Sequence, residues 1–87
     1  MKIGFIGLSH LGLCYLAASA EKGFNVIGYS KNKEYLLSIS KFKLTVKEPK
    51  LLNTLKRNQK KITFTNDLET LNNADLIFIS LDVKTNE

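Results

Sequence analysis

The chain has 87 residues, 44% hydrophobic and 24% charged, which suits one small globular domain and excludes intrinsic disorder. Its single cysteine excludes an internal disulfide and favours the cytoplasm, and no apolar run approaches the roughly 20 residues that span a bilayer, so we expect no membrane partner. We also expect no nucleic-acid partner despite the net charge of +5, because the one basic cluster suits the end of a helix: Lys56, Arg57, Lys60 and Lys61.

The first dozen residues predict a strand, a glycine turn and the start of a helix. The apolar run over residues 2–7 is typical of a strand buried on both faces, and a helical pattern follows over residues 10–22. Gly7 and Gly12 occupy the first and third glycine positions of the dinucleotide fingerprint G-x-G-x-x-G, whereas Ser9 stands at the second.

A turn of this kind can hold a phosphate, because it directs backbone N–H groups and the positive end of the helix dipole at one point. Gly7 lets the chain leave the strand sharply, Gly12 lets the helix approach it, and Ser9 adds a hydroxymethyl group that could donate a hydrogen bond. We therefore expect a cofactor's pyrophosphate against six residues: Gly7, Leu8, Ser9, His10, Leu11 and Gly12. The alternative is that the glycines only make a tight strand-to-helix turn.

The first helix is expected to bury the face formed by Leu11, Cys14, Tyr15 and Ala18, which follow one another at helical spacing. Cys14 is then a buried, inert thiol rather than a reactive one. Gly23 comes directly after the helix and is expected to end it in a left-handed conformation.

Residues 25–30 predict a second strand, parallel to the first, which completes a βαβ unit. Ser30 ends this strand, about 20 residues after the glycines, where an acidic residue would bind the ribose 2′-hydroxyl of NAD. Since Ser30 carries no charge and Lys31 and Lys33 follow it, this position favours the 2′-phosphate of NADP. The alternative is that both lysines are solvated at a helix start. Ser30 and Lys31 complete the predicted cofactor site.

The rest of the chain continues to alternate helices and strands. The expected elements are helices over 32–40 and 48–58 with a connector at 41–47 between them, a strand over 61–65, a short helix capped by Asn66 or Asp67, and a strand over 75–81. This alternation predicts an α/β fold, one Rossmann-like βαβαβ half, with a parallel sheet in the order 3-2-1-4 and helices on both faces. Because an exposed fourth strand is an aggregation hazard, we expect residues 1–87 to be a single, partial dinucleotide-binding domain of a truncated chain.

No catalytic constellation is visible in the sequence. His10 is the only histidine and lies inside the glycine turn, and no Cys/His cluster is spaced for a metal. The carboxylates at Asp67, Glu69 and Asp75 suit helix caps and helix ends. These 87 residues are therefore not expected to catalyse a reaction by themselves.

Four stretches, in the same order and with compatible spacings, resemble the N-terminal NAD-binding domain of the UDP-glucose/GDP-mannose dehydrogenase family. Residues 2–13 are similar to its opening K-I-x-x-I-G-x-G-Y-V-G-L, and residues 48–51 are similar to E-P-G-L. Residues 62–67 are similar to L-x-F-T-T-D, and residues 74–80 to A-D-V-I-F-I-A. The resemblance thus extends over the whole chain.

The resemblance implies the N-terminal part of a nucleotide-sugar 6-dehydrogenase. Such enzymes use NAD to oxidise the C6 alcohol of a nucleotide sugar to a carboxylate, carry a second domain for that substrate, and form homodimers or larger assemblies. The resemblance assigns the catalytic cysteine to a position far beyond residue 87, so Cys14 is not that nucleophile. It assigns cofactor contacts to the glycine turn and to Ser30, and it puts Val83 or Thr85 beside the nicotinamide.

Three positions depart from the family pattern, and two alternatives stay open. Ser9 replaces the middle glycine, Ser30 replaces an aspartate that selects NAD, and Lys50 replaces the glycine of E-P-G-L. The first two lie in the predicted cofactor site, so both NAD and NADP remain candidates. A cofactor domain of the 6-phosphogluconate or 3-hydroxyisobutyrate dehydrogenase type is one alternative, and a non-catalytic Rossmann-like binding module is the other.

Overall fold

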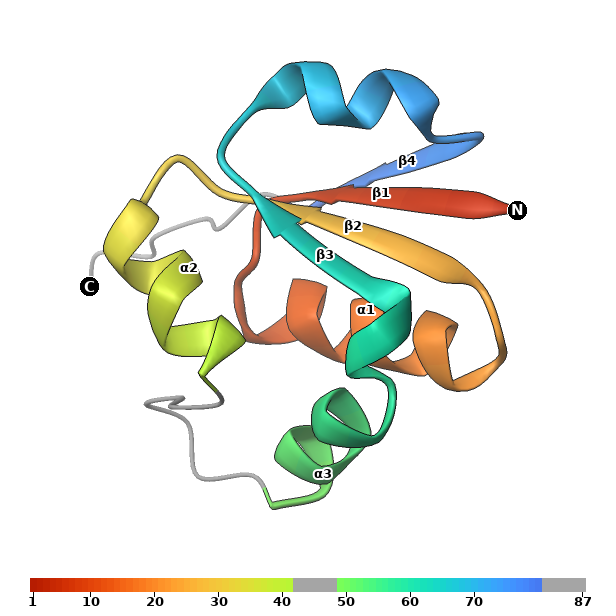
Figure 1. Cartoon of the computed structure of the whole chain (residues 1–87), viewed down its shortest axis with the longest axis vertical. Helices are drawn as coiled ribbons and strands as arrows, with labels where there is room; N and C mark the ends of the chain where they lie inside the picture. Colours follow the sequence, from red (N-terminus) through yellow and green to blue (C-terminus); the bar gives the residue numbers. More distant parts are fainter. Residues whose placement is uncertain (42–48, 81–87) are drawn as a thin grey trace, which may run out of the picture.

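A parallel four-stranded sheet forms the centre of the computed structural model, which describes residues 1–41 and 49–80. The strands are β1 (Lys2–Ile6), β2 (Asn25–Tyr29), β3 (Ile62–Thr65) and β4 (Leu76–Ile79). They pair in the order β3-β2-β1-β4, and every pair is parallel. The predicted Rossmann-like order is therefore confirmed (Figure 1).

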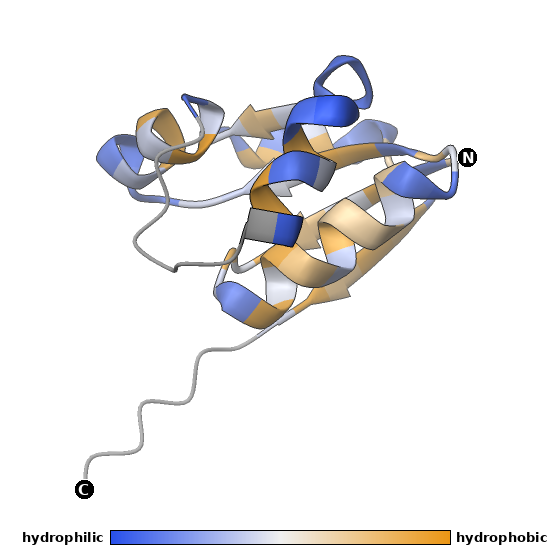
Figure 2. Ribbon diagram, turned by 90° about the horizontal axis from the view of Figure 1, so that it is seen from below, coloured by the Kyte–Doolittle hydropathy of each residue, from blue (hydrophilic) through white to orange (hydrophobic). Residues whose placement is uncertain are grey.

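In the described part of the chain, three α-helices cover one face of the sheet and a 3-10 helix covers the other (Figure 1). The helices are α1 (His10–Glu21), α2 (Lys33–Ser40), α3 (Pro49–Arg57), the 3-10 turn η1 (Gln59–Lys61) between α3 and β3, and the 3-10 helix η2 (Leu68–Asn73). The three α-helices share one apolar core with Ile3, Phe5 and Val26. On the opposite face, Leu71 of η2 packs with Ile27 and Tyr29. Helices on both faces are thus confirmed, and hydrophobic residues gather along the sheet between them (Figure 2).

The buried face of α1 differs from the prediction. Leu11 and Tyr15 expose 55% and 52% of their surface, Ala18 is exposed as well, and Cys14 is half-buried rather than fully buried. The residues that face the sheet are Gly12, Leu13, Leu16, Ala17 and Ala20. The reason is steric: three of these five residues are small, and a helix lies closest to a sheet along its smallest residues.

The basic cluster lies at the end of α3 and in η1, as predicted, and part of it joins α3 to α1. The carboxylate of Glu21 accepts hydrogen bonds from Arg57 Nε and Nη2 at 3.2 and 3.1 Å, and from Asn58 Nδ2 at 2.7 Å. The Asn58 amide first, and then the Arg57 guanidinium, hold the pKa of Glu21 below its ordinary value of 4.5. These contacts fix the end of α3 beside the end of α1.

Most of the other expected elements are confirmed. Gly23 follows α1 with a φ of +104°. The apolar residues at helical spacing in α2 and α3 are buried, apart from half-buried Tyr35 and Leu52: Leu36, Ile39, Leu51 and Leu55. Asp67 caps η2 by accepting the backbone N–H of Glu69 at 3.0 Å. The predictions for Glu48, Val83, Thr85 and all but the first residue of the connector fall on residues 42–48 and 81–87, outside the described residues.

The strand β4 forms an exposed edge of the sheet, as predicted. Its four residues expose 44–63% of their surface. On the helix side, the ring of Phe78 stacks against Phe5 and Tyr15, with centroids 5.6 and 6.2 Å apart. Among the described residues, β4 is therefore apolar, paired only with β1, and covered by little besides aromatic stacking.

Candidate functional site

The predicted cofactor residues gather at the carboxyl edge of the sheet. β1 leads through Gly7 into α1, β2 leads beside it into Ser30, and β4 leads on its other side into Ser80. The connection after β1 runs towards β2, whereas the connection through η2 returns to β4 on the opposite side of β1. Parallel sheets bind ligands outside the carboxyl ends of their strands at such a reversal. The glycine turn therefore stands where the topology favours a ligand.

Gly7 is required by both its backbone conformation and its surroundings. Its φ is +91°, in the left-handed region that L side chains rarely adopt. A Cβ atom at this position would collide with the carbonyl oxygen of Ser80. The backbone N–H of Gly7 donates to the carbonyl of Tyr29 at 3.3 Å. Only glycine fits between the ends of β1, β2 and β4.

Gly12 lets the first turn of α1 pack on this same point. A Cβ atom at Gly12 would collide with the carbonyl oxygen of Gly7, and it would lie 3.5 Å from the Cβ of Ser80. Both glycines are therefore required by internal packing, with or without a ligand. The sequence left two alternatives open, a tight turn and a phosphate-binding turn. Both need the same geometry at the two glycines.

Ser9 begins α1 as its N-cap residue. Its Oγ accepts the backbone N–H of Gly12 at 3.3 Å and lies 3.3 Å from the Oγ of Ser80. Its carbonyl accepts the N–H of Leu13 at 2.9 Å. The side chain at the middle fingerprint position is thus folded against the helix start. Sequence reasoning missed this capping role, although a serine before a helical pattern is the usual signal for it.

The other residues of the turn differ in their burial. Leu8 is buried, and its carbonyl accepts a hydrogen bond from the hydroxyl of Tyr35 in α2 at 2.5 Å. His10 and Leu11 are exposed on the first turn of α1, and His10 Nε2 lies 3.7 Å from Cys14 Sγ. No role in the turn was predicted for Tyr35, because nothing in the sequence relates residues 8 and 35.

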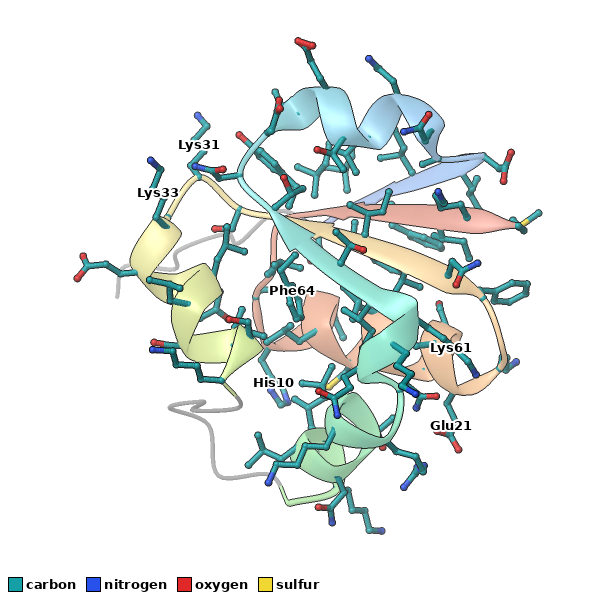
Figure 3. The ribbon with its side chains drawn as sticks, viewed as in Figure 1. His10, Glu21, Lys31, Lys33, Lys61 and Phe64 are labelled. Carbon is teal, nitrogen blue, oxygen red and sulfur yellow. The ribbon has the colours of Figure 1, made fainter. Side chains whose placement is uncertain are left out.

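Ser30 and Lys31 form the corner between β2 and α2. The Oγ of Ser30 accepts the backbone N–H of Asn32 at 3.2 Å, and the Oδ1 of Asn32 caps α2 by accepting the N–H of Tyr35 at 3.0 Å. Lys31 and Lys33 are both exposed at this corner (Figure 3), and Lys33 also lines a pocket beside β3. The corner therefore combines a hydroxyl that helps to shape the turn with two solvated positive charges.

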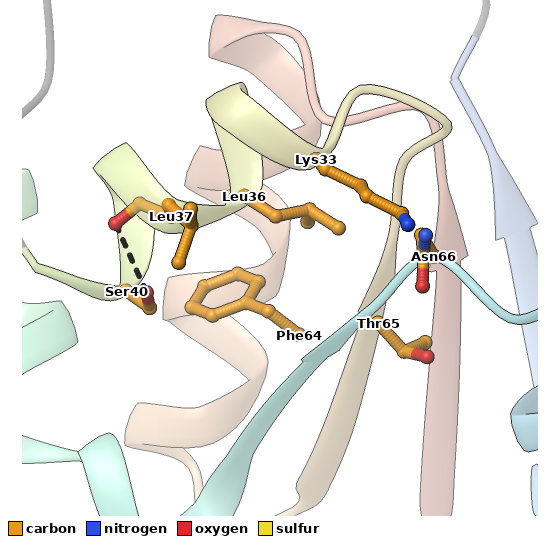
Figure 4. Close-up of a pocket in the computed structure, with 7 residues that line it drawn as sticks. All are labelled: Lys33, Leu36, Leu37, Ser40, Phe64, Thr65 and Asn66. Carbon is orange, nitrogen blue, oxygen red and sulfur yellow. Dashed lines mark hydrogen bonds between the residues drawn. The ribbon is translucent and has the colours of Figure 1, made fainter.

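A pocket of about 380 Å³ lies between α2 and β3. Its lining residues are Lys33, Leu36, Leu37, Ser40, Phe64, Thr65 and Asn66 (Figure 4). Leucine side chains and Phe64 form its walls, with Lys33 and Asn66 at one end. It contains none of the eight predicted cofactor residues, so it is separate from the glycine turn.

Residues 1–41 and 49–80 contain no group of three His, Cys, Asp or Glu side chains that could hold a metal ion. Within the same ranges, no helix is long and apolar enough to cross a membrane. The chemical groups that the turn offers are therefore backbone N–H groups, two serine hydroxyls and the helix dipole.

A family comparison shows where the chain belongs. The model of the UDP-glucose/GDP-mannose dehydrogenase family, NAD binding domain, matches residues 1–87. The chain belongs to this family. The resemblance seen in the sequence is confirmed, and the family description supports NAD as the cofactor of this domain. A comparison with curated protein sequences found no match.

Solved structures of nucleotide-sugar dehydrogenases share the fold. UDP-D-ManNAc dehydrogenase from Pyrococcus horikoshii is 26% identical, with a TM-score of 0.86. GDP-mannose dehydrogenase from Pseudomonas aeruginosa, solved as a ternary complex, is 22% identical with a TM-score of 0.88, and UDP-glucose dehydrogenase from Pyrobaculum islandicum is 23% identical with a TM-score of 0.83. The matches cover 93%, 100% and 92% of this chain but 20%, 21% and 19% of those chains. This chain thus spans about one fifth of their length.

Proposed function

We propose that this chain binds NAD at the glycine turn, as the N-terminal part of a nucleotide-sugar 6-dehydrogenase. The observation that carries the proposal is a positive-φ glycine turn at the topological reversal of the sheet, in a chain of an NAD-binding family. The family match favours this enzyme over the 6-phosphogluconate and 3-hydroxyisobutyrate dehydrogenase types.

The groups around the turn suit a pyrophosphate. The two glycines keep Cβ atoms away from the point where β1, β4 and α1 meet. The first turn of α1 contains no acidic residue, and the positive end of its dipole faces the turn. The hydroxyl proton of Ser9 can be donated to a phosphate oxygen, since the bond from Gly12 uses Ser9 as an acceptor. Ser30 and Lys31 are proposed to flank the adenosine ribose.

The proposed role of these residues is to bind and orient the cofactor. Bound NAD would accept one hydride in each of two successive oxidations, so that two NAD are used when a sugar C6 alcohol is converted to a carboxylate. The nucleotide-sugar substrate, the homodimer and the cytoplasmic setting are proposed for the longer enzyme, on the support of the family and its solved members. Cys14 is proposed to have no part in the chemistry, since it lies on the flank of α1.

We propose NAD as the principal cofactor, with NADP bound as well. The family description favours NAD, whereas Ser30 offers no carboxylate to repel a 2′-phosphate and Lys31 adds a positive charge. In titration calorimetry, the NADP affinity should fall more steeply with salt than the NAD affinity. Lys31→Gln should weaken NADP and leave NAD unchanged. Equal salt dependence of the two affinities would remove NADP from the proposal.

The substitution Leu11→Asp tests the turn without disturbing its packing. Leu11 is 55% exposed in the first turn of α1, where a carboxylate favours the helix but repels a phosphate. Titration calorimetry should show NAD binding weakened roughly tenfold or more. Leu68→Asp is the matched control, because Leu68 is 53% exposed at the start of η2 on the opposite face. Undiminished binding by Leu11→Asp would move the site elsewhere, and no binding by the wild type would favour the non-catalytic module.

A further inference from the structure

A hydrogen bond from α2 holds the peptide unit in the middle of the glycine turn. The hydroxyl of Tyr35 donates to the carbonyl oxygen of Leu8 across 2.5 Å, between residues 27 positions apart in the sequence. The side chain of Leu8 is only 4% exposed, and the ring of Tyr35 packs against the same core. The backbone of the turn at Leu8 is thus held both by its buried side chain and by α2.

The position of Tyr35 is itself set at the start of α2. Ser30 Oγ accepts the N–H of Asn32 at 3.2 Å, and Asn32 Oδ1 accepts the N–H of Tyr35 at 3.0 Å. With the bond to Leu8, three hydrogen bonds run from the predicted ribose position to the predicted phosphate position. The buried side chain of Leu36, the next residue, keeps this end of α2 on the core.

The bond to Leu8 determines where the N–H of Ser9 points. The Leu8 carbonyl and the Ser9 N–H belong to one peptide unit, and the described residues contain no cis peptide bond. In a trans peptide the C=O and N–H bonds point in opposite directions. Since Tyr35 draws the carbonyl towards α2, the Ser9 N–H is directed away from α2. Ser9 stands at the fingerprint position where a pyrophosphate comes closest to the backbone.

We propose that Tyr35 is a positioning residue of the nucleotide turn, which orients the Ser9 N–H towards the pyrophosphate by holding the Leu8 carbonyl. This inference rests on the proposed function, since it names the residue that shapes the same site. Tyr35 acts through Leu8 and does not itself contact the cofactor. Without its hydroxyl, the peptide unit can rotate, and its donor is aligned with the phosphate for only part of the time.

The substitution Tyr35→Phe removes the hydroxyl and keeps the ring in the core. Titration calorimetry should show NAD binding roughly tenfold weaker. The affinity for adenosine, which carries no phosphate, should stay at the wild-type value. Tyr15→Phe is the matched control, because it removes the hydroxyl of a half-exposed tyrosine of α1 that lies outside the turn. Wild-type NAD affinity in Tyr35→Phe would overturn the proposal.

A measurement without any ligand separates this inference from the proposed function. The NMR signal of the Ser9 amide should shift and its hydrogen exchange should quicken in Tyr35→Phe, and both should stay unchanged in Tyr15→Phe. If the wild type does not bind NAD while the Ser9 amide responds, the proposed function is wrong and the positioning of the peptide unit is supported. An unchanged Ser9 amide in folded Tyr35→Phe would overturn the positioning role even if NAD binds.

Discussion

The two edges of the sheet differ in what covers them. β3 keeps Ile62 and Phe64 half-buried against the core that the α-helices share, and it exposes Thr63. β4 is entirely apolar, yet each of its residues exposes between 44% and 63% of its surface. The more hydrophobic edge strand is therefore the more exposed one.

The comparison of the two edges shows that the placement of helices, and not the hydrophobicity of a strand, decides how much of an edge strand is buried. The connections through α1, α2 and α3 run from β1 towards β3, so their helices cover that side of the sheet. On the β4 side, the aromatic stack of Phe78 with Phe5 and Tyr15 is the cover that the helix face provides. Since burial of apolar surface stabilises by about 25 cal/mol per Å², β4 is the edge that a further protein surface would stabilise most.

The largest expected effect lies where β4 meets β1. Gly7→Ala should destabilise the fold by roughly 3 kcal/mol, because the new Cβ meets the Ser80 carbonyl in a backbone conformation that already disfavours alanine. Gly23→Ala is the control, since Gly23 also has a positive φ but nothing within 4 Å of its Cβ position, and it should cost about 1 kcal/mol. Urea denaturation measures both. Equal losses of unfolding free energy in the two variants would show that the contact with Ser80 does not constrain Gly7.

The next largest effect is the loss of stability when a leucine buried under the helices is replaced by alanine, compared with the same change at the β4 edge. Leu55 of α3, on the β3 side, is 1% exposed, and Leu55→Ala should cost about 2–3 kcal/mol of unfolding free energy. Leu76 of β4 is 48% exposed, and Leu76→Ala should cost less than about 1 kcal/mol. A similar loss in the two variants would mean that the β4 edge is buried in solution.

A lysine placed on each edge strand should affect self-association differently, and it should change stability less than the substitutions above. Ile79, the most exposed residue of β4, becomes charged in Ile79→Lys, which should weaken any association of the purified chain through that edge. Thr63→Lys adds the same charge to β3 and should leave association unchanged. Sedimentation at several concentrations measures both variants. Equal effects would show that net charge, and not the β4 edge, governs association.

The smallest expected effect is on the pH dependence of folding stability, through the contacts of Glu21 between α1 and α3. Hydrogen bonds from Asn58 and Arg57 lower the pKa of Glu21, so the folded state binds this proton less readily than the unfolded state. The stability that Glu21 contributes is therefore present above pH 4.5 and is lost as the pH falls through the lower, folded-state pKa. Glu21→Gln should remove this part of the pH dependence. Thermal unfolding measured from about pH 3 to about pH 7, a range that includes the ordinary pKa of glutamate, tests this. An identical profile for the variant would contradict this.

Prediction from sequence succeeded where the signal was local. The strand, the glycine turn and the helix start occur within a dozen consecutive residues, and the order of the strands follows from alternating strands and helices. It failed for the buried face of α1, because apolar spacing favoured Leu11 and Tyr15 while close packing selected the small residues. It also missed the contact between Tyr35 and Leu8, since a bond across 27 residues leaves no periodic signal.

The class of the fold, the place of the turn and the family follow from the amino-acid sequence alone, because these depend on residue types at short spacings. The tertiary structure was needed to explain why the two glycines are required, since the atoms that exclude a side chain at Gly7 belong to Ser80 at the other end of the described chain. It likewise decided that Ser9 caps α1 and that β4 is the open edge. Such contacts join residues far apart in the sequence, and only the packing of strands and helices against one another brings those residues together.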